Sequence, residues 1–281
     1  MPGGAALSGT LYLVATPIGN LEDITFRAVR VLKEADVVAC EDTRQTRTLL
    51  DHYGIRKRTI SYHEHNEAQR SRELLAELLQ GTTVALVSDA GMPLVSDPGY
   101  RLVRAAIENG IPVEAVPGAS ALVTSLAASG LPADRFYFGG FLPAKPGQRQ
   151  KALEAAKEVA ATLIFYEAPH RILDTLAAVE QTLGNRPVVV ARELTKVHEE
   201  ILRGAAREVR ATLAARESVK GEITLLIGRG SGVADDDTPL GEAVESCMRQ
   251  GMGRMEAIKT VAHRRGLSKR EVYGELEKLK P

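Results

Sequence analysis

Short apolar runs alternate with longer amphipathic stretches over the first 130 residues of the chain. The apolar runs are rich in Val, Leu and Ile and predict buried strands at 11–15, 36–40, 59–62, 82–87 and 112–116. The amphipathic stretches predict helices at 23–35, 43–53, 66–80, 100–109 and 121–128. Asp23 or Thr25 is expected to cap the first helix. Strands that alternate with helices indicate an α/β fold with a largely parallel sheet.

The pattern breaks at residues 131–148, where prolines, glycines and aromatic residues cluster, and we interpret this segment as a domain junction. A second α/β set follows. Its strands are expected at 162–166, 187–193, 199–204 and 222–228, and its helices at 150–159, 169–183 and 205–215. Residues 199–204 follow the preceding strand closely enough for an antiparallel return. The sequence thus predicts two α/β domains, at 10–135 and 136–228, after a flexible lead-in at 1–9.

After a linker at 229–237, residues 238–281 show helical periodicity with two breaks, which predicts three short helices. Residues 257–276 resemble a helix-turn-helix. This tail holds nine Lys and Arg against six Asp and Glu. Its net charge of +3 suits contact with nucleic acid, and it suits equally a packing or dimerisation bundle with a solvated basic face.

Composition excludes several classes of protein. The 281 residues carry 36 Lys and Arg and 36 Asp and Glu, so no global positive field points to nucleic acid. Cys40 and Cys247 match no metal or redox spacing, which fits a reducing cytoplasm. No segment is apolar enough to cross a bilayer, so a cytoplasmic protein with no membrane partner is expected.

Residues 88–99, SDAGMPLVSDPG, hold two Gly, two Pro, two Asp and two Ser directly after an apolar run. Glycine permits close backbone approach and proline fixes φ, so this segment predicts a sharp loop after a strand. Loops at the carboxyl edge of a parallel sheet commonly hold ligands. An ordinary connection explains one Gly and one capping Asp, and Asp97 is in that case the cap of the next helix.

Two other loops are expected at the same edge, at residues 17–20 and 117–120, and the three together can wall a cleft. The spacing G-x-G-x-x-G is absent, which disfavours a dinucleotide site, and no P-loop motif occurs. His63 and His65 could chelate a metal on a loop, but no third ligand accompanies them, and we expect no metal. Charged motifs occur at 41–50, 61–67, 165–171 and 191–200. They could belong to a functional site or form solvated ion-pair clusters.

Nine motifs carry a family resemblance, in order: LVATPIGNLEDITFRA, CEDTR, SYHEHNE, VSDAGMPLVSDPGYRLV, VPGASA, GGFLP, FYEAPHR, ARELTK and GEITLLIG. Over about residues 10–228 the chain resembles the ribosomal RNA small subunit methyltransferase I family, a branch of the tetrapyrrole (corrin/porphyrin) methylase superfamily. The tail resembles the family's C-terminal helix-turn-helix extension. Met92 stands where the family usually has Thr.

The resemblance implies two α/β domains with S-adenosylmethionine in the cleft between them. It implies 2′-O-methylation of a cytidine ribose in the decoding region of 16S rRNA in the small ribosomal subunit, and a homodimer. The cofactor-binding residues that it implies are Pro17, Ile18, Gly19, Asp89, Ala90, Gly91, Met92, Pro93, Ser120, Ala121, Tyr166 and Ile223.

The reaction needs a group that accepts the proton of the 2′-hydroxyl or a cation that stabilises the developing oxyanion. Glu193 as acceptor and Lys196 as cation are the predicted catalytic pair, since residues three apart can share a face; a local ion pair explains them equally well. The residues expected to face RNA are Arg44, His63, His65, His170, Arg171, Arg192, Arg254, Lys259, Arg264, Arg265, Lys269 and Arg270.

Two other functions remain open. A methyltransferase that acts on carbon atoms of a tetrapyrrole precursor shares the implied fold and cofactor, but the charged motifs and the basic tail disfavour it. A non-enzymatic RNA-binding protein needs only the tail and leaves the loops at the sheet edge unexplained.

Overall fold

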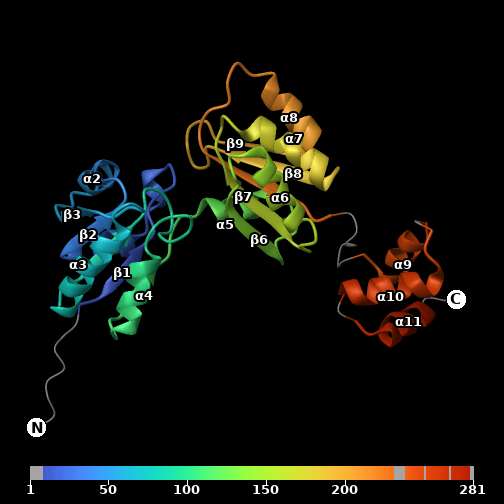
Figure 1. Cartoon of the computed structure of the whole chain (residues 1–281), viewed down its shortest axis with the longest axis horizontal. Helices are drawn as coiled ribbons and strands as arrows, with labels where there is room; N and C mark the ends of the chain where they lie inside the picture. The colour runs from blue at the N-terminus through green and yellow to red at the C-terminus, as the bar shows by residue number, and fades with distance from the viewer. Residues whose placement is uncertain (1–8, 231–237, 250, 266, 279–281) are drawn as a thin grey trace, which may run out of the picture.

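The chain forms two five-stranded sheets followed by three helices (Figure 1). A computed structural model describes residues 9–230, 238–249, 251–265 and 267–278. The first sheet has the order β3-β2-β4-β1-β5, and every pair in it is parallel. Its strands are β1 (Leu11–Val14), β2 (Val37–Cys40), β3 (Arg58–Ser61), β4 (Val84–Val87) and β5 (Val113–Val116). Because all five strands run the same way, the five loops that follow them meet at one edge.

Helices cover both faces of this sheet because alternate strand residues point to opposite sides. On one face, Leu74 and Leu102 pack with strand residues such as Leu86. On the other, Leu32 and Val38 belong to a second cluster. The first part of the chain contains η1 (Leu21–Asp23), α1 (Phe26–Glu34), α2 (Thr43–His52), α3 (Glu67–Leu79) and α4 (Tyr100–Glu108).

The second sheet is mixed, with the order β6-β7-β10-β8-β9. Only β6 and β7 pair in parallel, and β10 runs antiparallel to both of its neighbours. The predicted antiparallel return of β9 onto β8 is confirmed. The strands are β6 (Phe136–Phe141), β7 (Thr162–Glu167), β8 (Pro187–Arg192), β9 (Glu200–Ala205) and β10 (Ile223–Ile227).

Different helices cover the two faces of the second sheet. One face packs against α6 (Pro146–Ala156), α7 (Ile172–Leu183) and α8 (Ala206–Ala214). The other packs against α5 (Ala121–Ser129), whose Leu126 belongs to a cluster with Ile164 and Leu226. Figure 1 shows α5 where the two sheets adjoin. The chain therefore crosses to the second sheet before α5, although the domain boundary at residue 135 remains a prediction.

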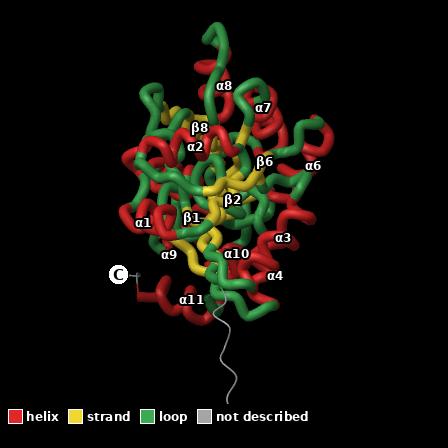
Figure 2. Tube along the Cα trace, turned by 90° about the vertical axis from the view of Figure 1, so that its left-hand side faces the viewer, coloured by secondary structure: helices red, strands yellow, loops and turns green. Residues whose placement is uncertain are grey.

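The three helices expected in the tail are α9 (Leu240–Arg249), α10 (Arg254–Arg265) and α11 (Lys269–Lys278). They share a core of their own, in which Val244, Ile258 and Val272 are buried. Figure 2 views the two sheets and their covering helices from the side. No helix in the described part of the chain is long and apolar enough to cross a membrane.

The structure differs from the sequence predictions at two places. Strand β6 lies inside the segment interpreted only as a junction, because its run FYFGGF has no clear alternation and contains two glycines. The alternative interpretation of Asp97 as the cap of the next helix is also wrong, because α4 begins after Gly99 and Asp97 does not cap it. Instead Glu67, at the start of α3, accepts hydrogen bonds from the backbone N–H groups of Gly99, at 3.0 Å, and Arg101, at 3.4 Å. At the first helix the expectation is confirmed, with Thr25 as the cap of α1.

Glu67 thus fixes the end of the loop at residues 88–99 from a different helix. We predict that Glu67→Ala lowers the free energy of unfolding by about 1–2 kcal/mol, because it removes a cap and leaves backbone donors without a partner. Urea denaturation measures this loss. Glu73→Ala is the control, since Glu73 lies in the same helix but in an exposed pair with Arg70, and its loss of stability is expected to be much smaller than that of Glu67→Ala. Equal losses in the two variants would contradict the capping role.

Candidate active site between the two sheets

The loops after β1 and β4 are held together by backbone hydrogen bonds. Thr16 N donates to Gly91 O at 2.9 Å, and Gly91 N donates to Thr16 O at 3.1 Å. The hydroxyl of Thr16 donates to Ser88 O at 3.1 Å, and the hydroxyl of Ser88 donates to Gly91 O at 3.0 Å. The two loops expected to form a cleft therefore make one rigid wall.

The opposite wall comes from the carboxyl ends of β7 and β8, the start of β10 and the segment after β8. The two walls approach closely at Gly19, where a Cβ atom would lie 2.5 Å from Lys196 Cγ and 3.0 Å from Leu194 O. At Gly221, φ is +91° and a Cβ would lie 2.4 Å from Glu193 Cδ. Glycine is required at these contacts because no side chain fits there.

Backbone strain is concentrated in one segment of each wall, the loop after β4 and the segment after β8. In the described part of the chain, non-glycine residues with positive φ occur at four positions: Leu94, Ser96, Glu193 and Thr195. The first two lie in the loop at 88–99, and the other two follow β8. Such conformations cost about 1–3 kcal/mol each and persist where surrounding contacts enforce them, as they commonly do at functional sites.

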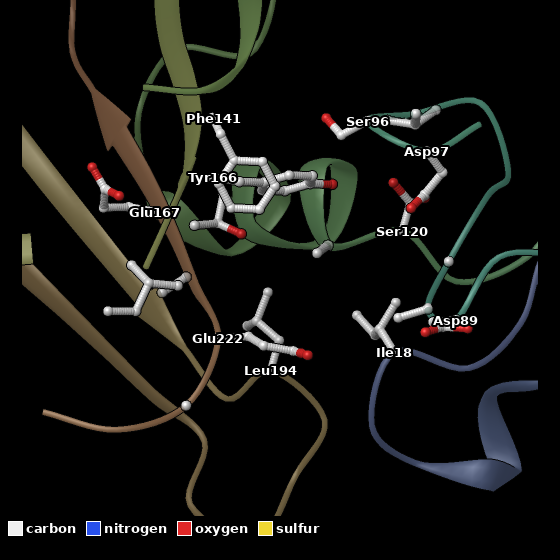
Figure 3. A pocket seen from close by; sticks show the side chains of 18 of the residues that line it. Ile18, Asp89, Ser96, Asp97, Ser120, Phe141, Tyr166, Glu167, Leu194 and Glu222 are labelled. Carbon is white, nitrogen blue, oxygen red and sulfur yellow. The ribbon is translucent and has the colours of Figure 1, made fainter. Parts of the chain in front are cut away.

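A cavity of about 370 Å³ lies between the two walls (Figure 3). Asp89, Asp97 and Ser120 line it from one side, and Tyr166 and Glu222 line it from the other. A neighbouring cavity of about 230 Å³ shares four lining residues with the first, Ile18, Asp89, Ala90 and Glu222. The smaller cavity also exposes Gln45, Thr46, Thr48 and Lys196.

The structure brings most of the expected cofactor-binding residues together. The larger cavity is lined by nine of them: Ile18, Asp89, Ala90, Gly91, Met92, Ser120, Ala121, Tyr166 and Ile223. Pro17 and Gly19 line the smaller cavity. Pro93 is buried and lines neither of the two. The motifs that carry the resemblance therefore converge in space from both sheets.

Sequence reasoning did not assign several residues of the larger cavity to the site: Val95, Ser96, Asp97, Phe141, Glu167, Ala168, Pro169, Ala191, Leu194, Gly221, Glu222 and Thr224. Half of them are direct neighbours in sequence of a predicted site residue, so proximity to a motif was the available signal. Glu167 is held by hydrogen bonds from Thr175 Oγ1 at 2.6 Å and Ala168 N at 2.7 Å, and it pairs with Arg171 at 2.6 Å. Its charge is thus fully compensated.

The predicted catalytic pair forms an ion pair. Lys196 Nζ lies 2.8 Å from Glu193 Oε1 and 3.1 Å from Glu222 Oε2. Glu193 Oε1 also accepts a hydrogen bond from Glu222 N at 3.0 Å. The hydrogen bond from Lys196, followed by that from Glu222 N, lowers the pKa of Glu193. Burial lowers the pKa of Lys196. The hydrogen bonds from Lys196 to Glu193 and Glu222 outweigh this effect, and the pKa of Lys196 is raised. The lowered pKa makes Glu193 a weaker base.

The carboxylates on the other wall are not compensated in this way. Desolvation, followed by repulsion from Glu41 and Asp89, raises the pKa of Asp97 to about 7. Desolvation raises the pKa of Glu41, and repulsion from Asp89 raises it further. Asp89 Oδ1 accepts a hydrogen bond from Asp42 N at 3.0 Å. The pKa of Tyr166 is raised by desolvation first and then by Asp97, against a hydrogen bond involving the Leu122 backbone that lowers it.

The residues expected to face RNA in the two-sheet part differ in exposure. Arg44 is 89% exposed and pairs with Asp42, whose pKa its hydrogen bonds lower to about 2. Arg192 is bound to Glu200 and to Lys220 O. His170 and His65 are exposed, and Arg171 is tied to Glu167. His63 is half-buried, and its ring packs edge-on against His65.

In the tail, Arg254, Lys259, Lys269 and Arg270 are exposed. Arg265 donates to Thr238 O, and the side chain of Arg264 lies outside the described residues. Among the described side chains of the tail, none lines either of the two cavities. Among the described residues, no group of three or more His, Cys, Asp or Glu is arranged to hold a metal ion.

The chain is similar to known methyltransferases over nearly its whole length. Residues 10–210 match the family model described as Tetrapyrrole (Corrin/Porphyrin) Methylases. A relative from Halalkalibacterium halodurans, named Ribosomal RNA small subunit methyltransferase I, is 54% identical over 94% of this chain and 93% of its own length. A relative of the same name from Mesorhizobium japonicum is 50% identical, over 98% and 93% of the two chains.

Solved structures share the fold. The uroporphyrin-III C-methyltransferase of Thermus thermophilus, complexed with S-adenyl homocysteine, superimposes with a TM-score of 0.54 and 25% identity. That match covers 78% of this chain and 97% of the other. The expected fold, with two α/β units and a helical tail, is confirmed. By sequence and by fold, the chain belongs to the ribosomal RNA small subunit methyltransferase I family of tetrapyrrole methylases.

Proposed function

We propose that the protein transfers a methyl group from S-adenosylmethionine to the ribose 2′-hydroxyl of a cytidine in the decoding region of 16S ribosomal RNA. The observation that carries this proposal is the identity of 54% over nearly the full length of a small-subunit rRNA methyltransferase. The cavity between the sheets supports this proposal, because the motifs that carry the family resemblance line the cavity from both walls. The substrate is proposed to be the RNA of the small ribosomal subunit, which also supports the prediction of a cytoplasmic protein.

The larger cavity fits the cofactor. Its volume of about 370 Å³ falls within the range of roughly 300–1,000 Å³ typical of small-molecule sites. Its wall combines apolar groups such as Ile18 and Phe141 with hydroxyls and carboxylates that can orient a polar, charged molecule. The residues proposed to hold S-adenosylmethionine are the twelve expected from the resemblance. Nine of them line the larger cavity, Pro17 and Gly19 lie beside it in the loop that both cavities share, and Pro93 acts only by supporting the loop. The bound cofactor supplies a methyl group on a positively charged sulfur.

The smaller cavity is proposed to receive the target nucleotide. It adjoins the larger cavity through Ile18 and Asp89 and offers polar side chains from α2, such as Gln45 and Thr48. Lys196 also lines the smaller cavity and is the proposed cation that stabilises the developing oxyanion. Glu193 as proton acceptor remains a prediction, but its bonds to Lys196 and Glu222 N favour a positioning role.

A homodimer is part of the same proposal. It is supported by apolar side chains left exposed on α5 and β6, including Val123, Phe136 and Phe141. Exposed aromatic and aliphatic groups of this kind are typical of protein interfaces.

Methyl transfer to small subunits tests the function directly. We expect label from S-adenosylmethionine to enter 16S rRNA of subunits that lack the modification, and the methylated linkage to resist alkali because its 2′-oxygen can no longer attack the phosphate. A porphyrinoid precursor serves as the competing substrate. Label in the porphyrinoid alone would support the tetrapyrrole methyltransferase, and RNA binding without any transfer would support a non-enzymatic binding protein.

Substitutions of the ion pair separate its two proposed roles. Lys196→Ala is expected to lower kcat by about 100-fold, as loss of one oxyanion-stabilising group does, while cofactor affinity is unchanged. Glu193→Gln is expected to lower kcat by about tenfold with an unchanged pH profile if Glu193 only positions Lys196. A loss of roughly 10²–10⁴ with an altered pH profile would instead identify Glu193 as the proton acceptor. Lys220→Ala, an exposed lysine outside both cavities, is the control. Full turnover in both variants would remove the pair from the mechanism.

The basic tail is proposed to bind RNA phosphates. We expect replacement of Arg254, Lys259, Lys269 and Arg270 by alanine to weaken binding to the small subunit. The slope of log affinity against log salt should fall by about 0.7–0.9 for each phosphate that the variant no longer neutralises. Arg30→Ala is the control, because Arg30 is occupied by Glu34 on α1. An unchanged slope in the fourfold variant would mean that the tail is a packing element only.

A further inference from the structure

Asp97 differs from Glu167 and Glu222, two other acidic groups of the cavity, because it has no partner that neutralises it. Glu167, in the same cavity, is paired with Arg171 and accepts two hydrogen bonds. Glu222 contacts the ammonium of Lys196. In the described part of the chain, no hydrogen bond or ion pair reaches the Asp97 carboxylate. Its side chain is therefore a negative group that faces the cavity without a partner.

Further carboxylates increase the negative potential at Asp97. Glu41, which follows β2, and Asp89, which follows β4, both repel the ionised Asp97. Tyr166 faces Asp97 from the opposite wall, and the charge of Asp97 contributes to the raised pKa of its phenol. Figure 3 shows Asp97 beside Ser120, with Asp89 on the same wall and Tyr166 across the cavity. His63 is the nearby basic group, and its charge opposes the rise in the pKa of Glu41.

The ionised form of Asp97 is unfavourable without a ligand, and its pKa of about 7 reflects this. A cation in the cavity reverses the balance, because it attracts the carboxylate that Glu41 and Asp89 repel. S-adenosylmethionine carries a sulfonium, an ammonium and a carboxylate, with a net charge of +1. The product, S-adenosylhomocysteine, has lost the sulfonium charge and is neutral overall.

We propose that Asp97 is a specificity-determining residue that makes the cavity prefer the positively charged methyl donor over its neutral product. The inference rests on the proposed function for the identity of the ligand. Attraction of the sulfonium holds the donor, and loss of that charge on methyl transfer weakens the hold on the product. The recessed carboxylate thus favours exchange of product for a fresh donor.

The proposal implies that a proton leaves when the donor binds. Because the pKa of Asp97 is raised to about 7, part of the Asp97 side chains hold a proton near pH 7 when the cavity is empty. Binding of the cation favours the ionised form, so a fraction of a proton per site passes to the buffer. Below pH 7 the affinity for the donor should fall by up to about tenfold per pH unit, because the proton and the cation compete. The neutral product should show little of this dependence.

Calorimetry in two buffers of different ionisation enthalpy measures the released proton directly. We expect the wild-type protein to release a measurable fraction of a proton per site near pH 7 with S-adenosylmethionine and much less with S-adenosylhomocysteine. In Asp97→Asn the release should disappear, and the ratio of affinities for donor and product should fall by about tenfold. Asp51→Asn, on the exposed surface of α2, should leave both quantities unchanged.

A second variant tests the origin of the effect. In Glu41→Gln the repulsion on Asp97 is smaller, so proton release should shift to lower pH. Folding of Asp97→Asn is checked by its melting temperature, which should stay equal or rise. The sign follows because the folded pKa lies above the unfolded value of about 4, so ionisation of Asp97 costs stability as pH rises toward 7.

The two proposals fail in different ways. An unchanged donor-to-product ratio and unchanged proton release in Asp97→Asn would overturn the role of Asp97, whether or not RNA is methylated. Binding of the donor with the expected charge preference, but without transfer to small subunits, would leave this inference standing and reject the proposed function.

Discussion

The candidate site depends on an apolar contact between the two sheets. Ile18, in the loop after β1, is 6% exposed and packs in one cluster with Ile164 and Leu226 of the second sheet and with Leu194 of the segment after β8. Burial of an isoleucine is worth about 1.5–3 kcal/mol, and α5 adds Leu126 to the same cluster. Ile18 also lines both cavities, so the contact that joins the sheets also forms the shared wall of the site.

Hydrogen bonds then hold the loops on this apolar base in conformations that they would not adopt alone. Thr16 and Gly91 exchange two backbone hydrogen bonds, and Glu67 reaches from α3 to fix Gly99. The positive φ values at Leu94 and Ser96 lie between these two anchors. Because both ends of the loop are fixed, the strain does not relax by local movement. A site held in this way is organised before any ligand binds, which lowers the entropy cost of binding.

Most of the framework could be predicted from the sequence, because it depends on local patterns. Alternating apolar and amphipathic runs specify the parallel sheet, and parallel strands necessarily bring their following loops to one edge. What could not be predicted depends on distant contacts. The capping role of Glu67 joins residues 32 apart in sequence, and α5 packs on the second sheet because of apolar partners that lie later in the chain. The run FYFGGF has no periodic signal for β6.

Within the site, the sequence identifies which loops matter better than which side chains do. Asp97 resembles a helix cap, since Asp before Pro and Gly is common at such positions, and only the fold shows that Glu67 has that role. Glu193 and Lys196 stand out because they share one motif, but their spacing could not distinguish a catalytic pair from an ion pair. Motifs thus record proximity along the chain, whereas function depends on what each charge faces.

Charge compensation explains how a chain of zero net charge can serve both a polyanion and a cationic ligand. Arg44 is 89% exposed in its pair with Asp42, and water weakens an exposed pair of this kind. Under the proposed function, an RNA phosphate would therefore replace the aspartate at little cost. Asp97 presents the opposite case, because its charge is partly desolvated and unpaired, and water screens it less. The surface cations are thus available through weak pairing, while the cavity keeps a negative charge that no other side chain neutralises in the described part of the chain.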